Sequence, residues 1–167
     1  MPGPEPREAD ATGRVVVCRD GDLAVGERRV IKVGRRRVGV FRVNATATAT
    51  VDGGDGAGSG DGCYVALHGG CPHAGGALCE GPLTGTTLPA DEPYTYTYGM
   101  EGQVLRCAWH GIEFDVHTGR SLVDPKLRAR TYPVAVEDGA VTVFLRGVPA
   151  GNDAGDATKE AVKEARP

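Results

Sequence analysis

The sequence lacks long apolar runs, and no part of it shows the helical spacing of apolar side chains that marks an amphipathic helix. No run of about 18 apolar residues occurs, so we expect no membrane span. The N-terminal stretch MPGPEPREADATG has no apolar core, and we expect no secretory signal. The formal net charge is only −3, which gives no reason to expect binding to nucleic acid or to a membrane surface.

The sequence also lacks an even set of cysteines that could pair completely. Its five cysteines are Cys18, Cys63, Cys71, Cys79 and Cys107. An odd number without a signal peptide argues against a disulfide framework. A reducing compartment fits better, so we predict a cytoplasmic protein whose thiolates are available as metal ligands. Three of the five, Cys18, Cys63 and Cys79, are interpreted as buried thiols that behave as small apolar side chains.

The residues that are present favour an all-β domain. Short β-branched runs alternate with segments rich in Gly, Asp and Asn. We predict strands over residues 13–18, 28–33, 38–43, 63–67, 93–99 and 112–116, with a short strand before Cys107. Two further alternating runs flank Asp138-Gly139, and this pair predicts a hairpin with a type I′ turn, because both central residues of that turn need positive φ.

The predicted domain covers residues 14–147. We interpret residues 1–13 as a disordered leader and residues 148–167 as a disordered tail. Residues 44–62 are predicted to be a flexible insertion at a hairpin tip, because their Gly-, Asp- and Ser-rich half cannot bury enough apolar surface to become ordered.

Candidate metal ligands occur in two loops. The segment CPH supplies Cys71 and His73, and the segment CAWH supplies Cys107 and His110. Each loop follows a short strand and is followed by glycine, which lets the backbone turn close to a cofactor. Two Cys and two His can hold a tetrahedral zinc ion. They can also hold a two-iron cluster in which two His replace two Cys on one iron.

The segments CPHAGGALCEG and CAWHGIEFDVHTGR resemble the two cluster-binding loops of the Rieske 2Fe-2S iron–sulfur family, in its soluble ferredoxin and oxygenase branch. The resemblance implies that Cys71 and Cys107 hold the inner iron of the cluster, and that His73 and His110 hold the outer iron. It also implies a Rieske-type β-sandwich base with a smaller cluster-binding subdomain. The connection of 33 residues between His73 and Cys107 is longer than in most such proteins, and we expect its extra length, residues 83–102, to form an arm between the two loops.

The resemblance further implies one-electron transfer, as a ferredoxin-like carrier or as a small redox subunit of an oxygenase or reductase system. The expected partners are an electron-donating reductase and an electron-accepting oxygenase or reductase component. We do not expect a stand-alone oxygenase, because a cluster would leave only His68 and His117 of the four histidines for a second iron. Two alternatives stay open at this point: a redox-sensing or regulatory subunit, and a β-domain with structural zinc.

The resemblance also carries a redox prediction. High-potential members of the family carry an extra disulfide and two hydroxyl side chains at places that here correspond to Gly76, Trp109, Ile112 and Phe114. None of these four can form the disulfide or donate a hydroxyl bond. We therefore predict a potential in the low part of the Rieske range of about −150 to +300 mV.

Overall fold

The structure, a computed structural model, describes residues 5–44, 62–90, 92 and 94–146. These residues form three β-sheets and contain no α-helix, which confirms the predicted all-β class. The strands are β1 (Glu5–Pro6), β2 (Arg14–Arg19), β3 (Arg28–Val33), β4 (Arg36–Asn44), β5 (Gly62–His68), β6 (Leu83–Pro89), β7 (Tyr96–Arg106), β8 (Glu113–Asp115), β9 (Thr131–Tyr132), β10 (Val134–Glu137) and β11 (Ala140–Phe144), and a 3₁₀ turn, η1, spans Leu78–Glu80. None of the described segments forms a helix long and apolar enough to cross a membrane.

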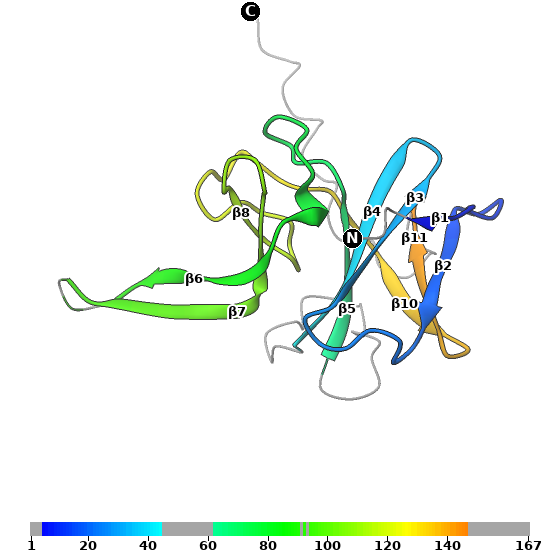
Figure 1. Ribbon diagram of the computed structural model, residues 1–167, viewed down its shortest axis with the longest axis horizontal. Coiled ribbons are helices and arrows are strands. Elements are labelled where there is room, and N and C mark those ends of the chain that lie inside the picture. The colour runs from blue at the N-terminus through cyan, green and yellow to red at the C-terminus, as the bar shows by residue number, and fades with distance from the viewer. Residues whose placement is uncertain (1–4, 45–61, 91, 93, 147–167) are drawn as a thin grey trace, which may run out of the picture.

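Two of the sheets form a sandwich that serves as the base of the molecule (Figure 1). The larger sheet has the order β1-β3-β4-β5-β9, and the smaller has the order β10-β11-β2. A first apolar core lies between them. It includes Val15, Val17, Ile31, Val38, Val40, Tyr64, Ala66, Val141 and Val143.

Strand β4 separates this core from a second one. Its sequence RRVGVFRVN is rich in β-branched residues, as expected for a strand that is covered on both faces. Val40 points into the first core, while its neighbour Phe41 points into the second. The second core packs β4 and β5 against the third sheet, of order β6-β7-β8, which is the smaller subdomain.

The predicted hairpin around Asp138-Gly139 is confirmed. Val134 pairs with Val143 and Glu137 pairs with Ala140 across it. Asp138 has φ of 50° and Gly139 has φ of 72°, so both central residues take the positive φ that the type I′ turn requires.

Two strands differ from the sequence prediction. Residues 83–89 form strand β6, although their Thr- and Gly-rich composition gave no strand signal. The two short strands expected near 93–99 and before Cys107 are one continuous strand, β7. Together β6 and β7 form a long hairpin arm that projects sideways from the body (Figure 1).

The predicted leader also differs in part from the structure. Glu5–Pro6 forms strand β1, which pairs in parallel with β3, and the Arg7 N–H donates to the Lys32 carbonyl at 2.9 Å. These backbone hydrogen bonds to a sheet edge hold residues that are too polar to show a strand pattern. Of the predicted insertion over 44–62, only Asn44 and Gly62 are described, and they pair as the last residue of β4 and the first residue of β5. The predicted tail over 148–167 lies outside the described residues.

Candidate metal centre

The two predicted ligand loops adopt the same backbone path. In the loop after β5, the Cys71 N–H donates to the Gly76 carbonyl at 2.7 Å, and the Gly75 N–H donates to the Cys71 carbonyl at 2.8 Å. In the loop after β7, the Cys107 N–H donates to the Ile112 carbonyl at 2.8 Å, and the Gly111 N–H donates to the Cys107 carbonyl at 2.9 Å. In each loop, the turn therefore begins at the cysteine and is closed by hydrogen bonds of that cysteine's own N–H and carbonyl. The bonded residues have the same spacing in the two loops.

A glycine with positive φ occupies the equivalent place in both turns. Gly75 has φ of 74° and Gly111 has φ of 69°, and a Cβ atom on either would meet nothing within 4 Å. Glycine is needed here for its backbone conformation and not for space, since other residues adopt positive φ only at a cost.

The loops bring the four predicted ligands together, with the thiols inside and the imidazoles outside. Cys71 and Cys107 are only 4% and 2% exposed, and both belong to the second core. His73 and His110 are exposed, and their ring centroids lie 4.9 Å apart in an edge-to-face arrangement. The site thus has a buried sulfur side and a solvent-facing imidazole side.

The loops are packed directly against each other. A Cβ on Gly76 would come within 2.9 Å of the Trp109 ring and 3.3 Å of the Cys107 Sγ. A Cβ on Gly81 would come within 1.8 Å of the Arg106 carbonyl oxygen. Trp109 therefore lies over the backbone of the first loop, although 64% of its surface stays exposed.

Burial is the main cause that raises the pKa of the Cys71 thiol. The neighbouring Cys107 thiol acts in the same direction, because two thiolates in contact repel each other. The backbone of His73 and Ala74 hydrogen-bonds the Cys71 sulfur and opposes this rise. Two adjacent buried sulfurs are therefore unfavourable as free thiolates, and a cation between them would remove that conflict.

The sequence profile of the Rieske [2Fe-2S] domain matches residues 13–137 of this chain. The protein belongs to the Rieske 2Fe-2S family. The ferredoxin component of the alkene monooxygenase system of Xanthobacter autotrophicus (strain ATCC BAA-1158 / Py2) is 26% identical over 147 residues, which are 88% of this chain and 93% of that protein.

Solved structures of similar fold include the ferredoxin of carbazole 1,9a-dioxygenase from Nocardioides aromaticivorans IC177, with 22% identity and a TM-score of 0.53 over 80% of this chain and 98% of that one. Another is a chain in the complex of reduced oxygenase and oxidized ferredoxin in carbazole 1,9a-dioxygenase, with 23% identity and a TM-score of 0.53 over 80% of this chain and 94% of that one. At such identities these similarities show the fold alone.

The donor set of this Rieske domain fits a 2Fe-2S cluster. Two thiols and two imidazoles meet at one place, and backbone amides reach a sulfur from the protein side. In the described parts of the chain, no three His, Cys, Asp or Glu side chains converge as ligands of a single ion. A two-iron cluster does not need such a triad, because each iron takes only two ligands from the protein.

Residues that the sequence analysis did not identify also hold the first loop and the end of the strand before it in place. The Arg28 guanidinium donates to the Gly81 carbonyl and, at 3.2 Å, to the Glu80 carbonyl. His68 Nδ1 lies 3.2 Å from the Tyr132 hydroxyl. No local motif points to Arg28 or Tyr132, because both lie on strands that are far from the first loop in the sequence.

The three cysteines interpreted as buried thiols, Cys18, Cys63 and Cys79, are buried and free. Cys79 lies on η1 just behind the first loop, and its thiol donates to the Leu67 and His68 carbonyls, each at 3.5 Å. Burial raises the pKa of Cys79 to about 12, which leaves it as an unreactive thiol at neutral pH.

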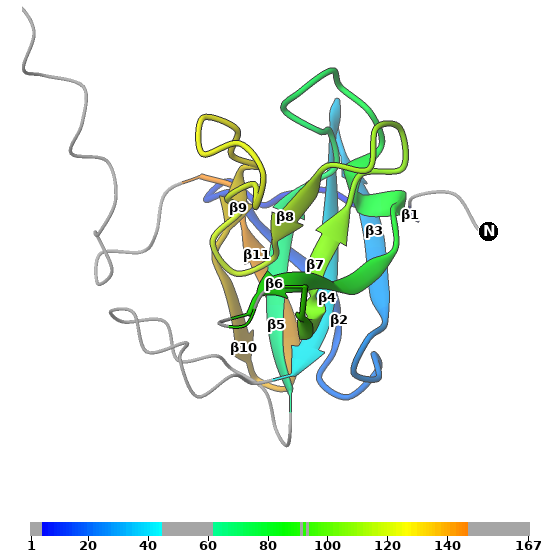
Figure 2. The ribbon, with the colours of Figure 1, turned by 90° about the vertical axis from the view of Figure 1, so that its left-hand side faces the viewer.

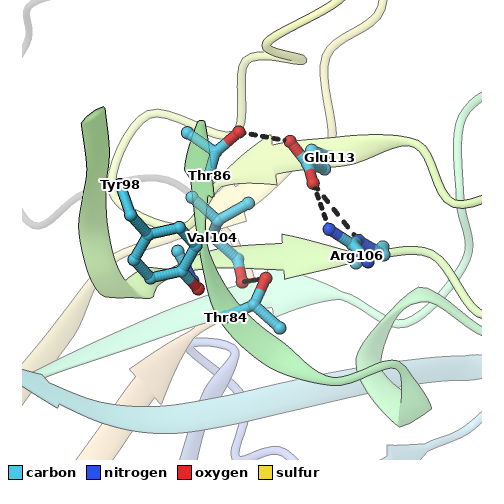
Figure 3. A network of polar contacts seen from close by, with 7 residues as sticks. Thr84, Thr86, Tyr98, Val104, Arg106 and Glu113 are labelled. Atoms are coloured by element: carbon cyan, nitrogen blue, oxygen red, sulfur yellow. Dashed lines mark hydrogen bonds and ion pairs between the residues drawn. The ribbon is translucent and has the colours of Figure 1, made fainter. Parts of the chain in front are cut away.

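A polar network connects the arm to the base of the second loop (Figure 3). Glu113, the first residue after that loop, accepts hydrogen bonds from the Thr86 hydroxyl of β6 at 2.7 Å and from the Arg106 guanidinium at 2.6 Å. Burial acts to raise the pKa of Glu113, but Thr86 and Arg106 outweigh it and hold the pKa below its ordinary value. The ionised carboxylate therefore fastens three strands beside Cys107.

Proposed function

We propose that this protein carries one electron at a time between two protein partners, as a ferredoxin of the Rieske type. The observation that carries the proposal is the pair of matched loops, which gather two buried thiols and two exposed imidazoles at one end of the molecule. A 2Fe-2S cluster, when bound, supplies a centre that accepts and releases a single electron.

We propose Cys71, His73, Cys107 and His110 as the ligands of that cluster. The two cysteines would hold the inner iron, because their sulfurs lie in the second core. The two histidines would hold the outer iron, because their rings face solvent. The exposed imidazole edges would then be the part of the site that a partner protein reaches.

The chain's own residues are arranged to keep this site rigid and partly dry. The backbone hydrogen bonds of both turns fix the cysteines, and Trp109 covers the backbone of Gly76. A rigid site favours electron transfer because little reorganisation accompanies a change of charge.

The partners that we propose are an electron-donating reductase and an electron-accepting oxygenase or reductase component. Support comes from the relatives, since one is named as a ferredoxin component of a monooxygenase system and another appears in a complex of an oxygenase with a ferredoxin. We also propose a cytoplasmic location, where the buried free cysteines stay reduced. Fractionation of cells with an antibody against the chain tests this location, and recovery in an exported fraction would contradict it.

Electron paramagnetic resonance of the dithionite-reduced full chain tests the function and the ligands together. We expect a Rieske-type signal with a low average g value. His110→Ala should abolish that signal, and His117→Ala is the matched control that should retain it. A colourless protein that contains zinc would reject the function, and an unchanged signal in His110→Ala would reject the ligand assignment.

A further inference from the structure

Basic and acidic side chains gather at opposite ends of the molecule. The β3–β4 turn and both ligand loops lie at one end, while the β2–β3 loop and the β10–β11 turn lie at the other (Figures 1 and 2). The far end carries the acids Asp20, Asp22, Glu27, Glu137 and Asp138, of which Glu137 pairs with Arg14, and it also carries the exposed base Arg19. The end with the ligand loops carries the exposed bases Arg35, Arg36, Arg120, Lys126, Arg128 and Arg130.

These bases come from two segments that meet beside the first ligand loop. The His68 N–H donates to the Arg130 carbonyl at 2.8 Å, and the next N–H, that of Gly69, donates to the Arg37 carbonyl at 2.7 Å. Burial lowers the pKa of His68, and the charges of Arg130 and Arg36 lower it further. Both segments thus place positive charge near His68, the last residue of β5 before the first ligand loop.

The second ligand loop is flanked by exposed apolar side chains. Leu122 is held next to β8 by its N–H bond to the Glu113 carbonyl at 2.9 Å, and Val123 follows it. Val123 is 69% exposed and Trp109 is 64% exposed. An apolar centre with a polar rim is the usual anatomy of a protein interface.

The acids at this end do not cancel the bases. Glu80 pairs with the Arg37 guanidinium at 2.6 Å, and Glu113 pairs with Arg106. Asp115 accepts a hydrogen bond from the Thr118 hydroxyl at 3.0 Å, and Asp124 accepts the Lys126 backbone N–H at 2.9 Å. Asp10, which lines the same hollow as Arg35 and Arg36, accepts the Arg14 backbone N–H at 2.9 Å. These donors are neutral, so the three acids offset only half of the six exposed bases. The described residues give none of the six exposed bases a partner of opposite charge.

We propose that this end is a docking face for an acidic redox partner. The docking face consists of Trp109, Leu122 and Val123 together with the six exposed bases listed above. The inference rests on the proposed electron-transfer function, because it assigns the charge of the partner that takes or gives the electron at His73 and His110. The acidic far end would turn away from such a partner, so the charge distribution orients the encounter as well as attracting it.

The rate of electron transfer to small ions tests the charge of this face. Whether that rate rises or falls with salt concentration shows whether the face is positive or negative. The reduced full chain is mixed in a stopped-flow instrument with ferricyanide, an anion, or with tris(phenanthroline)cobalt(III), a cation. Above about 0.1 M ionic strength the Debye length is about 10 Å or less, so the rates report charge near the reacting histidines. We expect the ferricyanide rate to fall with salt and the cobalt rate to rise. If instead the overall charge of −3 governed the encounter, the ferricyanide rate would rise with salt and the cobalt rate would fall. That result would overturn the inference.

Two variants with the same change of charge locate the effect. Arg36→Glu alters the docking face, and Arg19→Glu alters an exposed position at the acidic end. We expect Arg36→Glu to lower the ferricyanide rate at low salt by about threefold or more, and Arg19→Glu to leave it nearly unchanged. Equal effects of the two would contradict a local face. Arg35→Glu repeats the test in the turn itself if Arg36→Glu does not fold.

Cytochromes of opposite charge extend the test to protein partners. Electron transfer from the reduced chain to acidic cytochrome b5 should slow as salt rises, and transfer to basic cytochrome c should not. The opposite pattern would reject the acidic partner. A Rieske signal recorded for every sample beforehand separates the outcomes, because its absence counts against the proposed function, whereas its presence with the wrong salt dependence counts against the docking face alone.

Discussion

At the scale of single residues, the two loop glycines carry a conformational demand that can be measured. Replacing Gly111 by Ala forces a side chain into positive φ where space is open, so the cost is backbone strain of about 1–2 kcal/mol. We expect Gly111→Ala to lower the temperature at which the holoprotein loses its visible absorbance. Gly111→Asn should lower it less, because Asn tolerates this conformation better. Equal losses in the two variants would mean that strain is not the cause.

The residues around the loops also lead to a prediction of potential. Gly76, Trp109, Ile112 and Phe114 offer no hydroxyl donor and no disulfide. Protein-film voltammetry at neutral pH should therefore give a midpoint in the low part of the range of about −150 to +300 mV. The variant Phe114→Tyr adds a hydroxyl donor in the second core, which also contains Cys71 and Cys107, and we expect it to shift the midpoint to a more positive value. A midpoint well above zero for the natural sequence would contradict the prediction.

The identities of the proposed ligands could be read from the sequence, because both loops carry their Cys and His within a few positions. The equivalent backbone hydrogen bonds of the two turns could not be predicted, because amino-acid composition does not specify which backbone groups pair. Arg28 and Tyr132 were missed for a related reason. Tyr132 reaches His68 because β9 pairs with β5. Arg28 reaches the Glu80 and Gly81 carbonyls from β3, which is separated from β5 by β4 in the larger sheet.

At the scale of elements, the arm is stabilised by a tyrosine that lies across a glycine. The Gly85 N–H donates to the Tyr98 hydroxyl at 2.8 Å. A Cβ on Gly85 would lie 2.6 Å from the Gly99 carbonyl oxygen and 2.8 Å from the Tyr98 ring. We expect Tyr98→Phe to remove the bond and to loosen the arm by about 1 kcal/mol. Gly85→Ala should loosen it at least as much, because the new Cβ displaces both the Tyr98 ring and the β7 backbone at Gly99. Faster amide hydrogen exchange confined to β6 and β7 is the measurement. Tyr96→Phe, at an exposed ring, is the control and should change nothing.

The network at Glu113 predicts a dependence on pH. The folded pKa of Glu113 lies below the unfolded value of 4.5, so its contribution to stability is fully present above pH 4.5. That contribution is lost as the pH falls through the folded pKa. We expect Glu113→Gln to lower the unfolding free energy by about 1 kcal/mol at pH 7 and to match the natural protein at the lowest pH. A difference that persists unchanged in acid would exclude the carboxylate charge as its source.

Element prediction succeeded where local chemistry decides the structure. Asp138-Gly139 fixes its turn through the φ angles of two residues, and the strand signals around it are strong. It failed for β6, whose Thr and Gly residues form a strand because β7 offers a long partner. The pairing of β1 with β3 likewise depends on a sheet edge further along the chain, because Ile31, the partner of Glu5, follows it by 26 residues.

At the scale of the whole molecule, the sequence indicated a base with a smaller subdomain but not what divides them. The division lies within β4, where successive side chains enter different cores. The basic and acidic ends could not be predicted either. The segments Arg35–Arg36 and Arg128–Arg130 are far apart in the sequence, and only the strands flanking His68 bring them to the same face.

Neighbouring residues on β4 allow the two cores to be tested separately. Val40 and Phe41 are both fully buried, but Val40 belongs to the base and Phe41 to the core that contains Cys71 and Cys107. Val40→Ala and Phe41→Leu each remove buried volume and should each lower the unfolding free energy by about 1–3 kcal/mol.

The distinction between them should appear at the cluster. We expect Phe41→Leu to speed the loss of visible absorbance at temperatures where circular dichroism still reports a folded base. In Val40→Ala, the two signals should be lost together, because unfolding of the base must precede release. If both variants lose the two signals in the same order, the cores unfold as one unit. The subdomain would then derive its rigidity from the whole sandwich and not from the side chains packed beneath its own loops.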